Sequence, residues 1–176
     1  IGFELESVSF AIALMSDQAD ATREWIALSG ETGAASFVGF DGLTLSATEL
    51  SLEINLAAAD GTLIDFANMD EGGLEIATGG EPITLDMAAE DGELLQVAGS
   101  IELSVADFFI LSGDFALQRS DAQVTLDDAS IREVATLQIG ANDVSAFAGL
   151  EGGTENAVGL DLSDADLALF LATDLN

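Results

Sequence analysis

The sequence predicts an all-β protein, and three observations lead to that prediction. Apolar and polar residues alternate with a period of two, as they do in half-buried strands. Asp-Gly and Gly-Gly pairs, which suit tight turns, separate these runs. The runs are short and closely spaced, and the chain has a single proline. We expect an elongated module, either a β-solenoid or an extended twisted β-sheet, with a compact β-sandwich as the alternative.

The strands are expected in the following order. The clearest run is 8–14, whose apolar residues at even positions share one face. Shorter or less regular runs follow at 25–28, 36–38, 50–54, 63–66, 83–85, 101–103, 124–126 and 134–139. Turns are expected at the Asp-Gly pairs 41–42, 60–61 and 91–92 and at the glycine pairs 72–73, 79–80 and 152–153. Helix is expected only in brief pieces, such as 55–60 or 87–91.

An internal repeat is the most informative feature of the sequence. The last 19 residues match the first 19 at an offset of 157, with five identities, and all seven apolar positions of 1–14 meet apolar partners. This pattern predicts that 1–157 is one full repeat unit and that 158–176 begins the next. The run 166–171 alone could be a helix, but its counterpart 9–14 alternates strictly, so we expect strand in both.

A shorter motif recurs within the repeat. It consists of an apolar residue, then Ser or Gly, then two or three small or acidic residues before the next apolar residue. The copies are 45–50, 103–108 and 162–167, with a looser copy at 139–144. The motif predicts two strands joined by a short polar corner. Such a corner either closes a hairpin or turns the chain between stacked sheets, and both alternatives stay open.

The composition excludes several classes of function. The 176 residues include 33 acids and three arginines, Arg23, Arg119 and Arg132, for a formal net charge of −30, and Cys, His, Lys and Tyr are absent. Disulfides, thiol nucleophiles, histidine bases and zinc fingers are therefore excluded. Three basic residues cannot neutralise the phosphates of a nucleic acid. No apolar run reaches 18 residues, so we expect no membrane insertion.

The sequence does not predict an enzyme. Pairs of carboxylates can hydrolyse glycosides, but with 33 acids in the chain a nearby pair carries little information. Aromatic residues make up 6% of the chain, and most of the phenylalanines lie on apolar strand faces, where core packing is the default. At 49% hydrophobic residues, the chain is expected to fold around a large core.

Calcium is the only cofactor that the sequence suggests. A folded domain with a charge of −30 repels itself, and either salt or bound divalent cations can screen that charge. The candidate ligands form three clusters of acids, for each of which a solvated acidic turn is the alternative. The clusters are Asp17 with Asp20, then Asp86 with Glu90 and Asp91, and finally Asp161 with Asp164 and Asp166.

The stretches 38–66, 103–120 and 136–150, together with 9–28 and 159–174, resemble modules of very large bacterial tandem-repeat proteins. The resemblance covers nearly the whole chain and carries no functional motif. It implies a giant protein of the adhesin, matrix or filament type, located outside the cell or on its surface. It does not imply catalysis.

Two functions follow as hypotheses. The first is a structural repeat module of a filament, stalk or matrix, whose partners are neighbouring copies of the same repeat. The absence of an initiator methionine agrees with a piece of a longer chain. The second is an adhesin-type module that recognises a glycan or a cell surface with the help of calcium. Strand exchange through the duplicated runs 2–14 and 159–171 offers a route to polymerisation.

Overall fold

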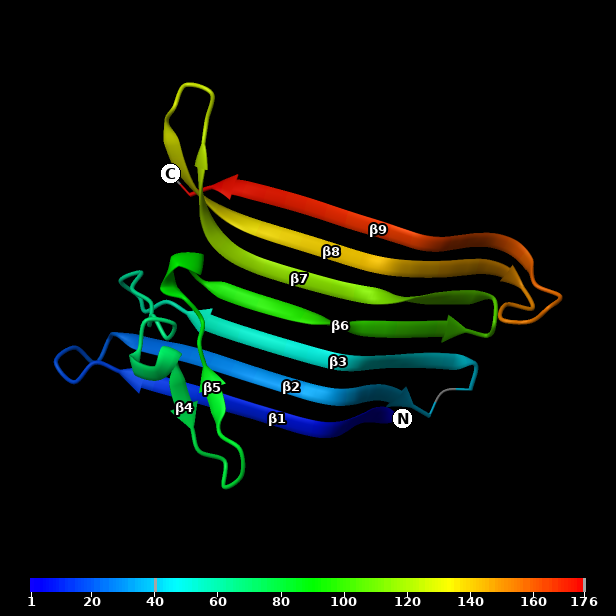
Figure 1. Cartoon of the computed structure of the whole chain (residues 1–176), viewed down its shortest axis with the longest axis horizontal. Coiled ribbons are helices and arrows are strands. Elements are labelled where there is room, and N and C mark those ends of the chain that lie inside the picture. Colours follow the sequence, from blue (N-terminus) through cyan, green and yellow to red (C-terminus); the bar gives the residue numbers. More distant parts are fainter. Residues whose placement is uncertain (40, 176) are drawn as a thin grey trace.

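A computed structural model of the chain describes residues 1–39 and 41–175. Its main feature is one seven-stranded antiparallel sheet with the order β1-β2-β3-β6-β7-β8-β9 (Figure 1). Neighbours in the sheet follow one another along the chain, apart from the insertion between β3 and β6. The strands are β1 (Gly2–Ser16), β2 (Glu24–Val38), β3 (Leu43–Leu56), β6 (Leu94–Val105), β7 (Phe109–Thr125), β8 (Ile131–Leu150) and β9 (Val158–Asp174).

The insertion between β3 and β6 is a small unit that lies on one face of the sheet. It contains the two-stranded hairpin β4 (Leu74–Ile76) and β5 (Ile83–Leu85), flanked by the 3-10 turns η1 (Asp70–Gly72) and η2 (Ala89–Asp91). In Figure 1 the hairpin crosses in front of β1 and β2, and β5 contacts both strands. The short helical piece expected at 87–91 corresponds to η2, whereas Asn55 belongs to β3.

The all-β prediction is confirmed, and the large sheet is antiparallel. Within the described residues the chain does not coil into a solenoid, and no second sheet of similar size covers the first. The strands are also longer than expected. The separate runs 25–28 and 36–38 both belong to β2, and β8 alone contains 20 residues.

Backbone bulges explain the length of the strands. In three copies of the short motif the strand continues through a residue with positive φ, namely Glu49 (54°), Asp143 (51°) and Asp164 (52°). The register shifts beside Glu49 and Asp143, as it does at β-bulges. Only the copy at 103–108 makes a hairpin, through the positive φ angles of Ala106 and Asp107. The prediction of a corner is therefore wrong for the other three copies, because a bulge absorbs the extra residue without turning the chain.

The prediction of a strand at 63–66 is also wrong. This segment is a loop, and the Phe66 side chain is completely buried in the core between the insertion and the sheet. The backbone N–H groups of Phe66 and Ala67 both donate to the Met87 carbonyl, at 3.1 and 3.3 Å. The alternation at 63–66 therefore reflects one anchoring side chain rather than a strand.

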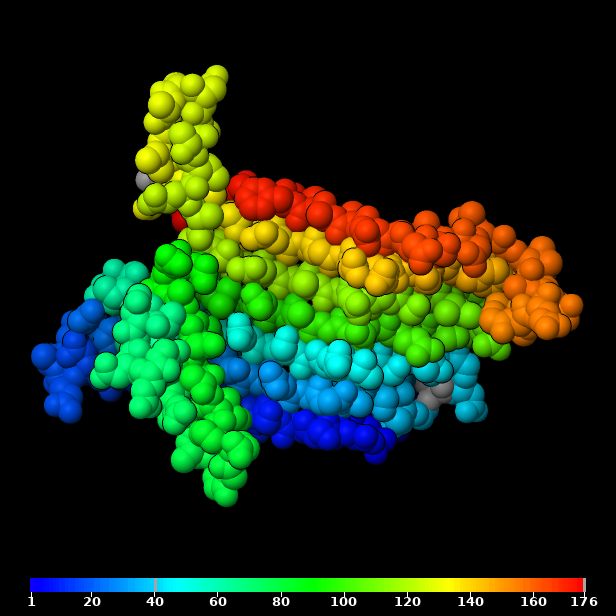
Figure 2. Space-filling view, viewed as in Figure 1, coloured from blue at the N-terminus to red at the C-terminus, as the bar shows by residue number. Residues whose placement is uncertain are grey.

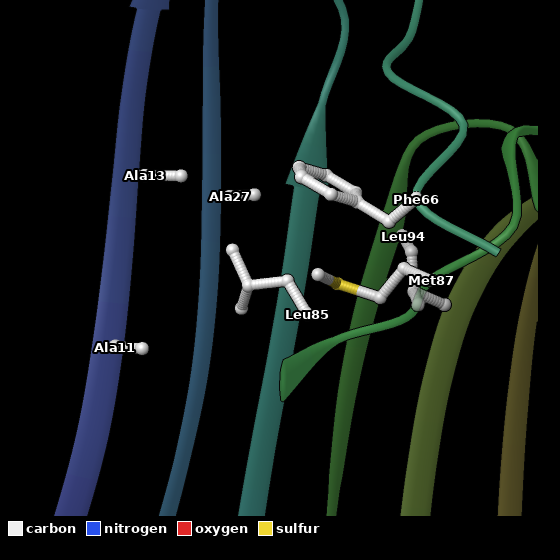
Figure 3. Packing of buried hydrophobic residues seen from close by; sticks show 7 residues of the cluster. All are labelled: Ala11, Ala13, Ala27, Phe66, Leu85, Met87 and Leu94. Carbon is white, nitrogen blue, oxygen red and sulfur yellow. The ribbon is translucent and has the colours of Figure 1, made fainter. Parts of the chain in front are cut away.

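A small core holds the insertion on the sheet. Figure 3 shows Phe66, Leu85 and Met87 from the insertion pointing toward Ala11, Ala13 and Ala27 on β1 and β2, with Leu94 beside them. Ala27, Phe66 and Leu85 are fully buried. The sheet carries alanine at these places, and their small side chains let the larger residues of the insertion approach the backbone closely.

The other face of the sheet is not covered by the described chain. Along β1, Phe10, Ile12 and Leu14 alternate with the buried alanines and are 61%, 48% and 74% exposed. The expectation of a large core is therefore wrong for the single chain. The insertion packs against the face that carries small residues and leaves the face with the large apolar residues bare.

Candidate functional site

The two edges of the sheet are open strands. Almost every residue of β1 is exposed, apart from those that contact the insertion, and β9 is exposed along its whole described length except at Ala165. β1 pairs only with β2, and β9 pairs only with β8. Within the described residues, each edge strand therefore has a neighbouring strand on one side only, which makes its other side a template for a further strand.

The two edge strands share an unusual backbone feature. Ser7 in β1 has φ of 55°, and Asp164 in β9 has φ of 52°. These residues are separated by 157 positions, the offset of the sequence repeat. A positive φ at a non-glycine residue in a strand is uncommon, so the similarity of the two strands extends from their side chains to their backbone.

The strand residues with positive φ keep the large apolar residues on one face. Leu5 and Val8 would point to opposite faces of a regular strand, but Ser7 interrupts the alternation between them. Apolar residues then form continuous rows across all seven strands. One row is Phe10, Gly30, Leu52, Val97, Leu117, Ile139 and Leu169, and another is Phe3, Phe37, Leu45, Leu103, Leu111, Ala146 and Leu162. We call this surface the apolar face.

A hollow on the apolar face lies over β2. Gly30 occupies a row position between Phe10 and Leu52, and the missing side chain leaves a space of about 350 Å³. Leu5, Val8, Leu28 and Leu50 also line this hollow, which is almost entirely apolar. A Cβ atom at Gly30 would make only ordinary contacts, the nearest at 3.4 Å from the Phe10 Cβ.

The opposite surface, which we call the acidic face, carries the insertion at one end. Figure 2 shows this side, with the insertion over the ends of β1 to β3 and the remaining strands bare. Its rows contain serine, glutamate and small residues, for example Glu4, Ser36, Ser46, Glu102, Ser112 and Ser145. The Ser100 hydroxyl donates to Asp114 beside one of its hollows.

Burial and neighbouring acids perturb one carboxyl on the acidic face. Glu53 lies in β3 near Asp86, which follows β5, and near Glu31 in β2. Burial is the main reason that the pKa of Glu53 is raised, and the negative charges of Asp86 and Glu31 raise it further.

A polar cluster fixes the turn between β1 and β2 against the segment after β3. Arg23 binds Asp17 and Asp60, each with an N–O distance of 2.8 Å, and its guanidinium lies 5.1 Å from the centre of the Trp25 ring. The Trp25 indole N–H donates to the Thr62 carbonyl at 2.9 Å. Trp25 therefore belongs to this partly buried cluster.

The same cluster lowers the pKa of three aspartates. Hydrogen bonds are the main cause, from the Ala19 backbone N–H to Asp17 and from the hydroxyls of Thr22 and Thr62 to Asp20 and Asp60. The positive charge of Arg23 lowers the same pKa values further.

The predicted calcium ligands lie in three separate places. Asp17 and Asp20 belong to the β1–β2 turn, where Asp17 already binds Arg23. Asp86 follows β5, and Glu90 and Asp91 lie in η2. Asp161, Asp164 and Asp166 lie along β9 rather than around a corner, and Asp166 accepts from the Asp143 backbone N–H at 3.2 Å. Across residues 1–39 and 41–175, no three acids converge as a metal site.

The repeat led the sequence analysis to both edges, but it missed the apolar face. The sequence predicts more large apolar faces than it has elements to cover them, and that imbalance is the signal for an uncovered face.

No protein-family model, curated protein or solved structure matches this chain. Among the described residues, no helix is long and apolar enough to cross a bilayer.

Proposed function

We propose that this chain is a non-catalytic structural module of a bacterial extracellular tandem-repeat protein, and that consecutive copies extend one antiparallel sheet into a filament, stalk or matrix. One observation carries the proposal. β9 repeats β1 in sequence and in the position of its positive φ residue, and β9 is paired with β8. β9 therefore occupies the place that the first strand of the next copy would take.

The register of that junction follows from the pairing of β8 with β9. Ile139 pairs with Leu169, and Leu169 is equivalent to Ile12 at the repeat offset of 157. Ile139 would therefore pair with Ile12 of the next copy. By the same step, Ala141 would face Phe10 and Leu137 would face Leu14 of the next copy. All of these residues lie on the apolar face, so the proposed junction continues its rows from one copy into the next.

A stability comparison tests the proposal. In a chain where residues 1–157 occur three times before residues 158–176, each internal β1 gains a neighbour that the single module lacks. We expect this chain to melt several degrees above the 176-residue chain, because neighbour interfaces stabilise repeat arrays. Equal melting temperatures would instead indicate independent beads and contradict a continuous sheet.

A disulfide tests the register, since the chain contains no cysteine of its own. In the same three-copy chain, Ile139→Cys in one copy and Ile12→Cys in the next should form a disulfide. Paired strand residues are about 4.5–5.5 Å apart at Cα, which falls within disulfide range. Gln138→Cys with Ile12→Cys is the control, because Gln138 points to the other face and should remain unlinked.

A further inference from the structure

The single chain exposes more surface than a compact protein of its size. Its accessible surface is 11350 Å². A compact monomer of 18.1 kDa is expected to expose about 8,100 Å², so the excess is roughly 3,300 Å². Extending the sheet at its edges would leave the apolar face uncovered, because edge pairing covers only β1 and β9. The apolar face therefore requires a partner of its own.

We infer that the apolar face binds the apolar face of a second copy of this module, so that two sheets pack face to face as a two-layer sandwich. Residues 1–39 and 41–175 supply the exposed rows but no element that covers them. This association goes beyond the edge pairing proposed above and does not depend on it, since backbone groups at the edges take no part in it.

The area of the face is sufficient for a stable dimer. Seven strands of 12 to 20 residues, spaced about 4.8 Å apart, give a sheet of at least roughly 1,500 Å². A stable interface needs about 800 Å² from each partner. Side chains such as Phe10, Leu52 and Val97 are of the kind that fill the space of about 10 Å between packed sheets. The hollow over Gly30 can receive a large side chain of the other copy.

The charge distribution favours a second copy as the occupant. Strand residues Glu4, Glu31, Glu53 and Glu102 lie on the acidic face, so in the sandwich they point outward into solvent on both sides. In the rows through Phe3, Phe10 and Ile12, Arg119 is the only charged residue, and it lies at the last pair between β6 and β7. There its guanidinium can reach water at the end of the face.

Two lysine substitutions in β6 test the apolar face and the acidic face independently. Val97 and Gln96 are neighbours on the central strand but point to opposite faces, and Val97 is 37% exposed in the single chain. We expect the 176-residue chain and Gln96→Lys to form dimers by sedimentation velocity in about 1 M NaCl, where charges are screened beyond roughly 3 Å. Val97→Lys should weaken the dimer by roughly a hundredfold or more, because it buries an unpaired charge.

Val97→Lys could lower the stability of the folded chain itself, so cross-linking through single cysteines provides a second test of the dimer. A twofold axis through the middle of the face brings the two copies of residue 97 close together. Val97→Cys should therefore cross-link to its partner with a short bis-maleimide, whereas Gln96→Cys should not. Hydrogen exchange of the β1 and β9 amides should stay equally fast in monomer and dimer, because pairing at the edges would protect them.

Three outcomes would overturn the inference. The first is a chain that stays monomeric at every concentration. The second is an equal effect of the Val97 and Gln96 substitutions. The third is binding of the monomer to neutral phosphatidylcholine vesicles without dimerisation, which would assign the apolar face to a lipid surface. If the three-copy chain gains no stability, that result contradicts the proposed edge pairing but leaves the face-to-face dimer unaffected.

Discussion

At the scale of single residues, the backbone of this protein departs from regular strand geometry in specific places. Ser7, Glu49, Asp143 and Asp164 have positive φ within strands. An L-residue in this region costs about 1–2 kcal/mol relative to extended backbone. The cost is offset because each of these residues keeps the apolar residues before and after it on the same face of the sheet.

Replacing Glu49 by glycine should stabilise the chain. Glycine adopts positive φ without steric cost, so we expect Glu49→Gly to raise the free energy of unfolding by about 1 kcal/mol, or about 2–4 °C in the melting temperature. Glu102→Gly, at an exposed position of β6 where φ is not positive, should lower it by about 0.5–1 kcal/mol. Thermal unfolding monitored by circular dichroism measures both, and equal losses would mean that Glu49 is not strained.

Glu53 should make stability depend on pH. Its pKa is raised in the folded state, so its carboxylate disfavours folding at neutral pH, and this effect disappears as pH falls and the group is protonated. We expect Glu53→Gln to raise the free energy of unfolding at pH 7 by roughly 0.5 kcal/mol, because it removes a partly buried charge and, with it, the repulsion from Asp86 and Glu31. The variant and the parent should melt alike near pH 3. Glu102→Gln, which removes one charge from the same face, should have a smaller effect at pH 7.

At the scale of elements, turns and insertions decide which surfaces are covered. The insertion between β3 and β6 attaches to β1 and β2 through Phe66, Leu85 and Met87, so it stabilises one end of the sheet. The Arg23 cluster joins the β1–β2 turn to the start of the same insertion. Both contacts act at one end of the sheet, where the turn η2 of the insertion also lies against β7.

Arg23→Gln should loosen this end and change its pH dependence. The pKa values of Asp17 and Asp60 are lowered in the folded state, so their contribution to stability is present above about pH 4 and is lost as pH falls below it. At pH 7 we expect the variant to melt a few degrees lower at most, with the difference shrinking near pH 2.5. Arg132→Gln in the exposed β7–β8 hairpin removes the same charge and should change little. An unchanged difference at low pH would argue against the ion pairs as its cause.

At the scale of the whole molecule, charge and shape act together. The chain has a net charge of −30, and strand acids such as Glu4, Glu53 and Glu102 lie on one face of the sheet, while the other face is apolar. Such a molecule is amphipathic as a whole. The proposed edge and face contacts would both cover apolar surface and leave the acids in solvent, where they would keep separate assemblies apart.

Salt should stabilise the folded chain, and the effect should not depend on which cation is added. Raising NaCl from about 10 mM to 1 M shortens the Debye length from roughly 30 to 3 Å, so the melting temperature should rise as repulsion among the acids is screened. Calcium and magnesium at equal concentration should then give equal melting temperatures, because the candidate acids lie in separate places. A saturable increase with calcium alone would instead support the calcium sites predicted from the sequence.

The sequence by itself determined the strand class, most turns and the match of its two ends at an offset of 157, because alternation, Asp-Gly pairs and offset matches are local or linear signals. It could not distinguish a bulge from a corner, since both use the same small and acidic residues at 45–50 and 162–167. It could not place 63–66, where one buried phenylalanine imitates a strand.

Only the tertiary structure decided which face of the sheet is covered. Alternation tells which residues share a face, and the large apolar face was the natural choice for the core. The insertion instead packs on Ala11, Ala13 and Ala27, because small side chains allow close approach while the larger residues opposite need a whole second layer. The described chain has no such layer. That face and the two open edges, rather than a pocket, are therefore the surfaces from which its function is inferred.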